Sequence, residues 1–278
     1  MNESTFSNWS KLGLGTGRLT SIGRGTTAAD VQRIISWMSE CGATVIDTAD
    51  SYTSGRSEEL LGQALQGRRD GFVLVTKSGY RYGDLPSPLR QLNPFVKKIH
   101  QKLNRASCHD ASYLVHHLNR SLQRLHTDYV DCFLLHDPPL EAVVDPAVQD
   151  NLQATRQAGK VLHIGVSSGE TAVLEAAIEA KCYTVIQSPG NPVTVPVLAP
   201  IWSRAEREGI YLMANHIFFS GTNPNLPLPA GMSVHEYLMR YISGHFANGT
   251  ILVGTKKEQH FKEAISWASR PFPAYRGT

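Results

Sequence analysis

Short runs rich in β-branched and apolar residues alternate along this chain with longer segments whose apolar residues recur at helical spacing. Eight strand-like runs can be counted, with helical segments between most of them. The runs cover residues 11–17, 44–49, 72–77, 129–136, 161–168, 183–188, 210–215 and 250–255. This alternation predicts parallel strands, because neighbouring parallel strands are joined by crossover connections that are usually helical.

The intervening segments show the apolar stripes and end signals of amphipathic helices. In residues 113–126, four leucines fall on one helical face. Residues suited to cap helix ends flank three of the segments, namely Thr27, Gly159 and Gly209. The predicted helices cover residues 30–42, 56–67, 113–126, 145–158, 170–180, 195–208, 234–245 and 258–268.

The number and length of these units favour a closed barrel over an open doubly wound sheet. Both folds share the alternation, but eight units within 278 residues are typical of a (β/α)8 TIM barrel. Polar or glycine residues also stand at the carboxyl end of each strand-like run, where such barrels carry their active sites. We therefore predict an α/β fold, a parallel eight-stranded barrel with outer helices, as a single domain over residues 1–278.

Composition argues against several classes of partner. The formal net charge of +3 is small and the basic residues are dispersed, so we expect neither nucleic acid nor a membrane as partner. The four cysteines are far apart, and the first residues lack the basic start and apolar run of a secretory signal. We therefore expect reduced cysteines, no metal site and a cytoplasmic protein, and no sequence feature indicates an oligomeric state.

Two connections that follow strands are long for this fold. Residues 78–106 contain prolines, glycines and a basic end, and residues 216–233 are rich in proline, glycine and asparagine. Both would overhang the active end of the barrel, either as substrate-covering loops or as solvated surface loops. The aromatic residues that are candidates for substrate contact, or else for ordinary packing, are Tyr80, Tyr82, Phe218 and Phe219.

Side chains able to carry chemistry follow three separate strand-like runs: Asp47, Tyr52, Lys77 and His136. Taken singly, each has an ordinary structural explanation, such as a turn aspartate or a packed histidine. Together they would meet at one end of a barrel. A nearby lysine cation favours the phenolate of a tyrosine, whose pKa is ordinarily about 10, and Asp47 would hold that lysine charged. Tyr52 can then protonate a carbonyl oxygen while His136 hydrogen-bonds the same oxygen.

None of these residues can supply a hydride, so this hypothesis requires a nicotinamide cofactor. The glycine run at residues 13–17 has the spacing GxGxG, and the next helix begins about ten residues later, so it is not a dinucleotide-binding fingerprint. In a barrel, Gly15, Thr16 and Gly17 would instead allow the backbone to approach the cofactor or substrate, or form a flexible turn.

A better phosphate site is the last strand-to-helix junction. Gly254, Thr255 and Lys256 precede the final helix, whose free backbone N–H groups can meet an anion beside Lys256 and Lys257. The alternative is an ordinary solvated helix start.

The chain resembles the aldo-keto reductases over nearly its whole length. The segments that carry the resemblance are, in order, DTADSYTSGRSEELLGQAL, VTK, SLQRLHTDYVDCFLLH, AGKVLHIGVSS, VIQS and ILVGTKKEQHFKEAI. The resemblance implies a (β/α)8 barrel that binds NADP(H), with Tyr52 as the proton donor of a catalytic tetrad that includes Asp47, Lys77 and His136. It further implies a cofactor site whose nicotinamide end is held by Ser167, Ser168 and Gln187, and whose adenosine phosphate end is held by Gly254, Thr255 and Lys256.

Departures from the family pattern bear on the cofactor. Asn215 and His216 stand where many members have an aromatic residue that stacks on the nicotinamide. Ser168 stands where asparagine is common, and His260 where an arginine commonly grips the 2′-phosphate. We count Asp47, Asn215, His216 and His260 with the cofactor site. NADP(H) is favoured because nearby lysines can compensate through charge, and NAD(H) is the alternative.

These observations predict an NADP(H)-dependent carbonyl reductase that acts on a small aldehyde, ketone or sugar-like substrate. One alternative is an NAD-linked alcohol or sugar dehydrogenase on the same barrel. Another is a nucleotide-sensing regulatory protein with a reductase scaffold, because a fold and a retained tetrad do not by themselves establish turnover.

Overall fold

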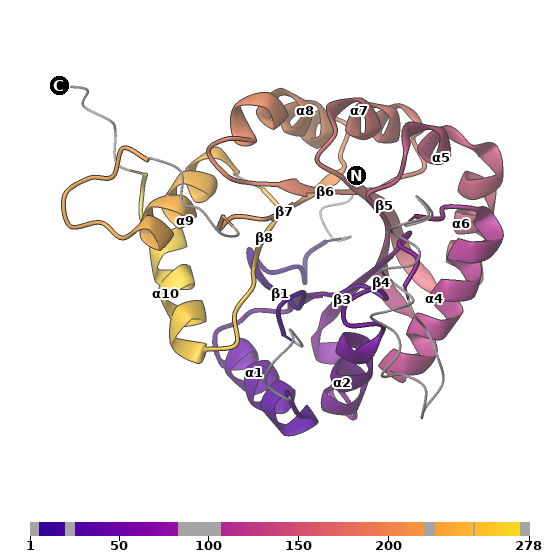
Figure 1. Ribbon diagram of the computed structural model, residues 1–278, viewed down its shortest axis with the longest axis horizontal. Coiled ribbons are helices and arrows are strands. Elements are labelled where there is room, and N and C mark those ends of the chain that lie inside the picture. Colours follow the sequence, from indigo (N-terminus) through magenta and orange to yellow (C-terminus); the bar gives the residue numbers. More distant parts are fainter. Residues whose placement is uncertain (1–5, 20–25, 83–106, 220–225, 247, 273–278) are drawn as a thin grey trace.

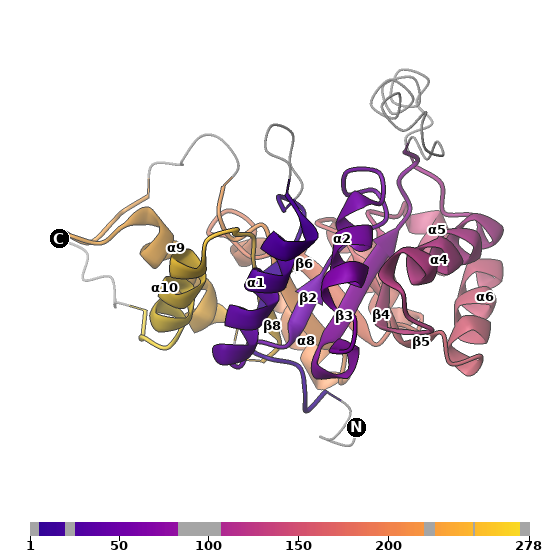
Figure 2. The same cartoon turned by 90° about the horizontal axis from the view of Figure 1, so that it is seen from below.

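Eight parallel strands pair in sequence order and close into a barrel, because the first strand also pairs with the last. The computed structural model describes residues 6–19, 26–82, 107–219, 226–246 and 248–272. Figure 1 shows the strands at the centre with a ring of helices outside them, and Figure 2 shows the helices packed along the outside of the barrel. The predicted (β/α)8 fold is therefore confirmed.

All eight predicted strands are present, and their ends lie within two residues of the ends of the apolar runs. They are β1 (Leu12–Gly15), β2 (Val45–Asp47), β3 (Val73–Ser78), β4 (Val130–His136), β5 (Val161–Ser167), β6 (Val185–Pro189), β7 (Tyr211–Asn215) and β8 (Thr250–Val253). Their carboxyl ends lie together at one rim of the barrel, since every pairing is parallel.

Helices follow the strands as the sequence predicted. They are α1 (Ala28–Glu40), α2 (Arg56–Ala64), α4 (Ala111–Leu125), α5 (Leu140–Val144), α6 (Pro146–Gln157), α7 (Thr171–Glu179), α8 (Val195–Arg207), α9 (Val234–His245) and α10 (Glu258–Ala268). Thr27 caps α1 in a capping box with Asp30, while Gly159 and Gly209 take left-handed conformations just beyond α6 and α8. The short helix α5 and a 3₁₀ turn at Arg69–Gly71 were not predicted, because neither is long enough to show a helical period.

The barrel is filled by side chains rather than open. Valine, leucine and methionine side chains from six of the strands meet inside it, among them Val75, Leu134 and Met213. Trp9 and Phe6, from the segment before β1, pack against this interior cluster at the amino end of the strands. A second, larger cluster lies between the strands and the helices. Chemistry that needs an open cavity is therefore confined to the carboxyl rim. Among the described helices, none is both long and apolar enough to cross a membrane.

Buried polar bonds fix β3 on either side of Lys77. The Thr76 hydroxyl donates to Glu58 Oε1 at 2.6 Å, and Arg124 Nε donates to the other oxygen of that carboxylate at 2.7 Å. The Ser78 hydroxyl donates to the fully buried Asp50 at 2.7 Å. Because both neighbours of Lys77 are anchored in this way, its position at the end of β3 is set by the scaffold.

Acid unfolding is expected to depend on His163. This β5 side chain is 7% exposed, lies 4.4 Å from the Phe6 ring between centroids, and has a pKa lowered by burial to about 4. The unfolded chain binds a proton near pH 6.5, so the free energy of unfolding falls as the pH drops from 6.5 towards 4, by up to about 3 kcal/mol.

His163→Gln should remove most of that loss in urea unfolding measured between pH 7 and pH 4. The matched control is His116→Gln, a substitution on the exposed face of α4. A wild-type pH dependence that survives in His163→Gln would show that burial of this imidazole is not its source.

Candidate active site

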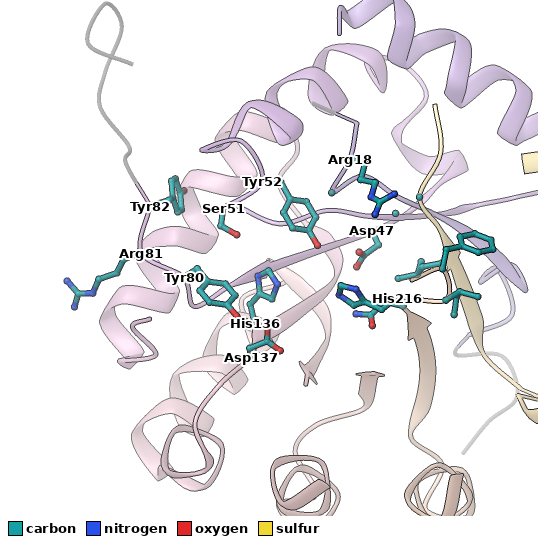
Figure 3. Close-up of a pocket in the computed structure, with 17 residues that line it drawn as sticks. Arg18, Asp47, Ser51, Tyr52, Tyr80, Arg81, Tyr82, His136, Asp137 and His216 are labelled. Carbon is teal, nitrogen blue, oxygen red and sulfur yellow. Dashed lines mark hydrogen bonds between the residues drawn. The ribbon is translucent and has the colours of Figure 1, made fainter. Parts of the chain in front are cut away.

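A cavity of about 530 Å³ opens at the carboxyl rim of the barrel. Its walls come from the ends of five strands, β1, β2, β4, β7 and β8, and from the segments that follow β1, β2, β3, β4, β7 and β8. Figure 3 shows the side chains that line it. The lining residues are Gly15, Gly17, Arg18, Asp47, Ser51, Tyr52, Tyr80, Arg81, Tyr82, His136, Asp137, Asn215, His216, Ile217, Phe218, Leu252 and Gly254. Three of the four residues predicted to carry the chemistry are therefore in one cavity wall.

The fourth residue, Lys77, lies beneath the cavity instead of lining it. Its Nζ donates to Asp47 Oδ1 at 2.6 Å and to the backbone oxygen of Thr48 at 2.8 Å, and the side chain is only 1% exposed. Burial acts to lower the pKa of Lys77, but Asp47 and Tyr52 outweigh it and hold the pKa above its usual value. The lysine is therefore a fixed cation under the cavity floor.

Tyr52 extends from the segment after β2 towards His136, with 6.0 Å between the two ring centroids. Lys77 Nζ lies 5.3 Å from the centre of the phenol ring. Gly17 lies beside the ring, where a β-carbon would be 3.4 Å from Tyr52 Cζ, an ordinary contact distance. Burial raises the pKa of Tyr52, and Lys77 opposes the shift without reversing it. The expected lysine effect has the predicted sign, but burial prevails, so the phenol stays protonated at neutral pH.

His136 ends β4 and is neutral in its surroundings. Burial, with the nearby Lys77, lowers the pKa of this imidazole well below its usual value. A neutral imidazole offers one N–H donor and one acceptor. Its backbone oxygen is 3.0 Å from His109 Nε2, while its own Nδ1 is buried and has no partner among the described residues. The ring can therefore hydrogen-bond a ligand without carrying charge into the cavity.

Gln187 joins the floor of the cavity to Asp47. Gln187 Nε2 donates to Asp47 Oδ1 at 2.9 Å, and its Oε1 accepts from Ser167 Oγ at 2.8 Å and from Asn215 Nδ2 at 2.9 Å. Asn215 Oδ1 is buried at the cavity without a hydrogen-bond partner in the described part of the chain. This amide-rich set suits a primary amide, which needs both donors and acceptors.

The other residues predicted for the cofactor fall into three groups. Those that line the cavity are Gly15, Gly17, Asn215, His216 and Gly254. Thr16 and Ser168 are buried, and their side chains form hydrogen bonds with backbone atoms. Thr16 Oγ1 donates to Asp47 O at 3.0 Å, and Ser168 Oγ accepts from Glu170 N at 3.1 Å. Those that stand at the β8–α10 junction or at the start of α10, outside the cavity lining, are Thr255, Lys256 and His260.

The predicted substrate contacts are partly described. Tyr80, Tyr82 and Phe218 line the cavity. Phe218 and Phe219 both pack against the core, and Phe219 is not part of the cavity lining. Most of the first long connection, residues 83–106, and residues 220–225 of the second lie outside the described residues. No group of three or more metal-ligating side chains occurs within the described ranges.

Some cavity residues were not predicted from the sequence, chiefly Arg18 and Asp137. Each directly follows a residue that was singled out, Gly17 or His136. That adjacency was the available signal, since residues just after a barrel strand stand at the rim even when their own type is unremarkable.

Comparisons with known proteins identify the family of this chain. A family model described as the Aldo/keto reductase family matches residues 11–220. "Uncharacterized oxidoreductase YqkF" of Bacillus subtilis is 26% identical over 211 residues, which cover 74% of this chain and 60% of that protein. "Aldo-keto reductase YhdN" of the same organism is 29% identical over 187 residues, covering 66% of this chain and 50% of that protein. The matches thus span between half and three fifths of these relatives.

Solved structures show the same fold at lower identity. A Bacillus halodurans aldo-keto reductase in its holo form has a TM-score of 0.72 and 22% identity, covering 96% of this chain and 89% of that one. A Klebsiella pneumoniae aldo/keto reductase in complex with NADP and acetate has a TM-score of 0.68 and 20% identity, covering 96% and 88%. At these identities the similarity shows that the fold is shared, and it shows nothing further.

Proposed function

The chain belongs to the aldo/keto reductase family, and from that membership we propose that it is an NADP(H)-dependent oxidoreductase that reduces an aldehyde or ketone to an alcohol. The observation that supports this most is the convergence of Tyr52, His136 and the buried Lys77–Asp47 pair on one cavity. A protonated phenol beside a neutral imidazole suits a carbonyl oxygen that gains a proton.

Tyr52 is the proposed general acid. As negative charge develops on the substrate oxygen, the phenol O–H transfers its proton to that oxygen, and the Lys77 cation beneath stabilises the phenolate left behind. His136 hydrogen-bonds the same oxygen and orients the carbonyl. Asp47 keeps the lysine charged and in place. Together, these residues stabilise the charges that develop on the substrate oxygen and on Tyr52, and so lower the barrier to proton transfer.

A nicotinamide cofactor suits the rest of the cavity. When bound, it supplies the hydride to the carbonyl carbon. The carboxamide is proposed to lie against Asn215, whose buried Oδ1 lacks a donor among the described residues, with Gln187 and Ser167 behind it. Lys256 and Lys257, exposed before α10, are proposed to meet the phosphate end.

NADP(H) is the favoured form for two reasons. The Klebsiella pneumoniae neighbour was solved with NADP, and the basic pair before α10 suits an extra phosphate. His260, exposed on α10, is the residue that argues for NAD(H), because an imidazole grips a phosphate less firmly than a guanidinium does. The four unpaired cysteines support the further proposal that the protein works in the reducing cytoplasm.

A fluorescence titration of the purified protein with NADPH and, separately, NADH tests this proposal. We expect NADPH to quench tryptophan emission with a dissociation constant at least about tenfold lower than that of NADH, which corresponds to one charge-assisted contact to the phosphate. Preference for NADH would instead support an NAD-linked dehydrogenase. Binding of neither nucleotide would contradict both enzyme assignments.

A further inference from the structure

Asp137 projects into the cavity from an uncommon backbone conformation. It follows His136 directly and has a φ of 46°, and its backbone N–H donates to Ser167 O at 2.8 Å. The left-handed region disfavours side chains other than glycine, with aspartate and asparagine among the best tolerated. The fold therefore places an acidic side chain in the cavity wall at a position that would more readily accept glycine.

Tyr80 binds this carboxylate and fixes it beside the reacting groups. The Tyr80 hydroxyl donates to Asp137 Oδ2 at 2.6 Å, and its ring stands edge-on to His136 with 4.7 Å between centroids. Tyr80 is held in turn by the Tyr113 hydroxyl, which donates to its backbone oxygen at 3.1 Å, and by a bridge to Ser107. Figure 3 shows Tyr80, Asp137 and His136 grouped on one side of the cavity.

One oxygen of the carboxylate is left for a ligand. Tyr80 takes Oδ2, and Oδ1 has no hydrogen-bond or ion-pair partner among the residues that the structure describes. Two arginines also line the cavity. In Figure 3, Arg81 points away from the pair and Arg18 lies on the far side of Tyr52. The Tyr80–Asp137 corner is therefore negatively charged and able to accept a hydrogen bond.

The negative charge of Asp137 acts on Tyr52, the proposed proton donor. Burial raises the pKa of Tyr52, and Asp137 adds to that shift in the same direction. Burial also raises the pKa of Tyr80, again reinforced by Asp137. Tyr80 is thus a hydrogen-bond donor and not a second acid. Because the Tyr80 ring contacts His136 and its hydroxyl binds Asp137, the Tyr80–Asp137 pair adjoins the imidazole assigned to the carbonyl oxygen.

We propose that Tyr80 and Asp137 form a substrate subsite that accepts a hydrogen bond from a hydroxyl group next to the reacting carbonyl and disfavours a carboxylate there. The inference rests on the proposed function and narrows it to uncharged hydroxylated aldehydes and ketones, as opposed to keto acids. The free Oδ1 accepts the substrate hydroxyl, while Tyr80 holds Oδ2 and sets the orientation of the carboxylate.

Three ketones that differ only in the group beside the carbonyl test this subsite: hydroxyacetone, butanone and pyruvate. With NADPH, we expect Asp137→Asn to raise the ratio of kcat/KM for pyruvate to that for butanone about tenfold, because the charge that repels the pyruvate carboxylate is removed. The hydroxyacetone-to-butanone ratio should fall severalfold. Asparagine tolerates the left-handed backbone and still accepts from Tyr80, so the variant is matched in shape.

Tyr80→Phe is the control, because it removes the hydroxyl and keeps the charge. Its pyruvate-to-butanone ratio should stay within about twofold of wild type. The inference is overturned if Asp137→Asn leaves both ratios unchanged, or if Tyr80→Phe relieves the discrimination against pyruvate to the same extent.

A binding measurement separates failure of this inference from failure of the proposed function. Saturation-transfer NMR with 1,2-propanediol and with lactate, in the presence and absence of NADP⁺, reports occupancy without turnover. We expect wild type to favour the diol and Asp137→Asn to gain lactate binding. If no ketone is reduced but this difference appears, the subsite stands and the reductase assignment fails. If the ketones are reduced and lactate binds both proteins equally, the subsite is wrong.

Discussion

Tyr52→Phe is expected to reduce kcat for carbonyl reduction by about 100- to 10,000-fold, the range that a positioned general acid contributes. The phenyl ring keeps its place beside His136 and above Lys77, so the geometry of the cavity is retained. Only the transferable proton is lost. Stopped-flow decay of NADPH absorbance with saturating aldehyde measures the effect directly.

NADPH affinity serves as the control for that variant. Because the hydroxyl is assigned to proton transfer and not to cofactor binding, the dissociation constant of Tyr52→Phe should stay within about threefold of wild type. Full activity in Tyr52→Phe would mean that another group is the acid.

Lys77→Met is expected to lower the free energy of unfolding by about 3–5 kcal/mol and to abolish most turnover. The lysine is 1% exposed and pairs with Asp47 at 2.6 Å, so its removal leaves a carboxylate buried with Gln187 as its remaining side-chain donor among the described residues. An unpaired buried charge is costly, whereas replacing both partners of a pair is often tolerated. Urea unfolding and steady-state kinetics measure the two effects separately.

A double variant separates stability from chemistry. Lys77→Met combined with Asp47→Asn removes both charges, and the asparagine oxygen can still accept from Gln187. We expect the double variant to recover most of the lost stability but to remain inactive, since no cation is left to stabilise the Tyr52 phenolate. Recovery of turnover along with stability would show that Lys77 acts only as a structural partner of Asp47.

The fold was predictable because the sequence repeats one signal many times. Seven of the eight strand-like runs end in a polar or glycine residue, and strand–helix alternation predicts parallel pairing. The alternation alone does not distinguish a closed barrel from an open sheet, because both folds share it. The pairing of β1 with β8 shows that the barrel is closed. The helix α5 was missed because its five residues cannot display a period.

The site was predictable at the level of which rim residues could meet, and less so in their detail. Asp47, Tyr52 and His136 line one cavity because each lies at or just after the carboxyl end of a strand. The Gln187–Asp47 hydrogen bond joins residues 140 positions apart, and no local pattern encodes it. The direction of the Tyr52 pKa shift depends on whether burial or the lysine charge prevails, and that balance is set by the folded surroundings of the phenol.

The role of Asp137 likewise depends on tertiary contacts that its residue type does not reveal. Its residue type is ordinary after a strand, but its positive φ and its bond to Tyr80 give it a defined place in the cavity wall. Both properties arise from tertiary contacts across two strand ends. Its place after β4 predicts that Asp137 lies at the rim, but the direction of its side chain depends on the folded backbone.

Transfer of label from deuterated NADPH tests the central claim most directly. Wild-type protein is incubated with propanal or hydroxyacetone and with NADPH deuterated at either the 4R or the 4S position, and the alcohol product is examined by mass spectrometry. We predict that one of the two labelled cofactors delivers a single deuterium to the carbinol carbon and that the other delivers none. An unlabelled alcohol from both cofactors, or no alcohol from either substrate, would contradict hydride transfer from a nicotinamide held in this cavity.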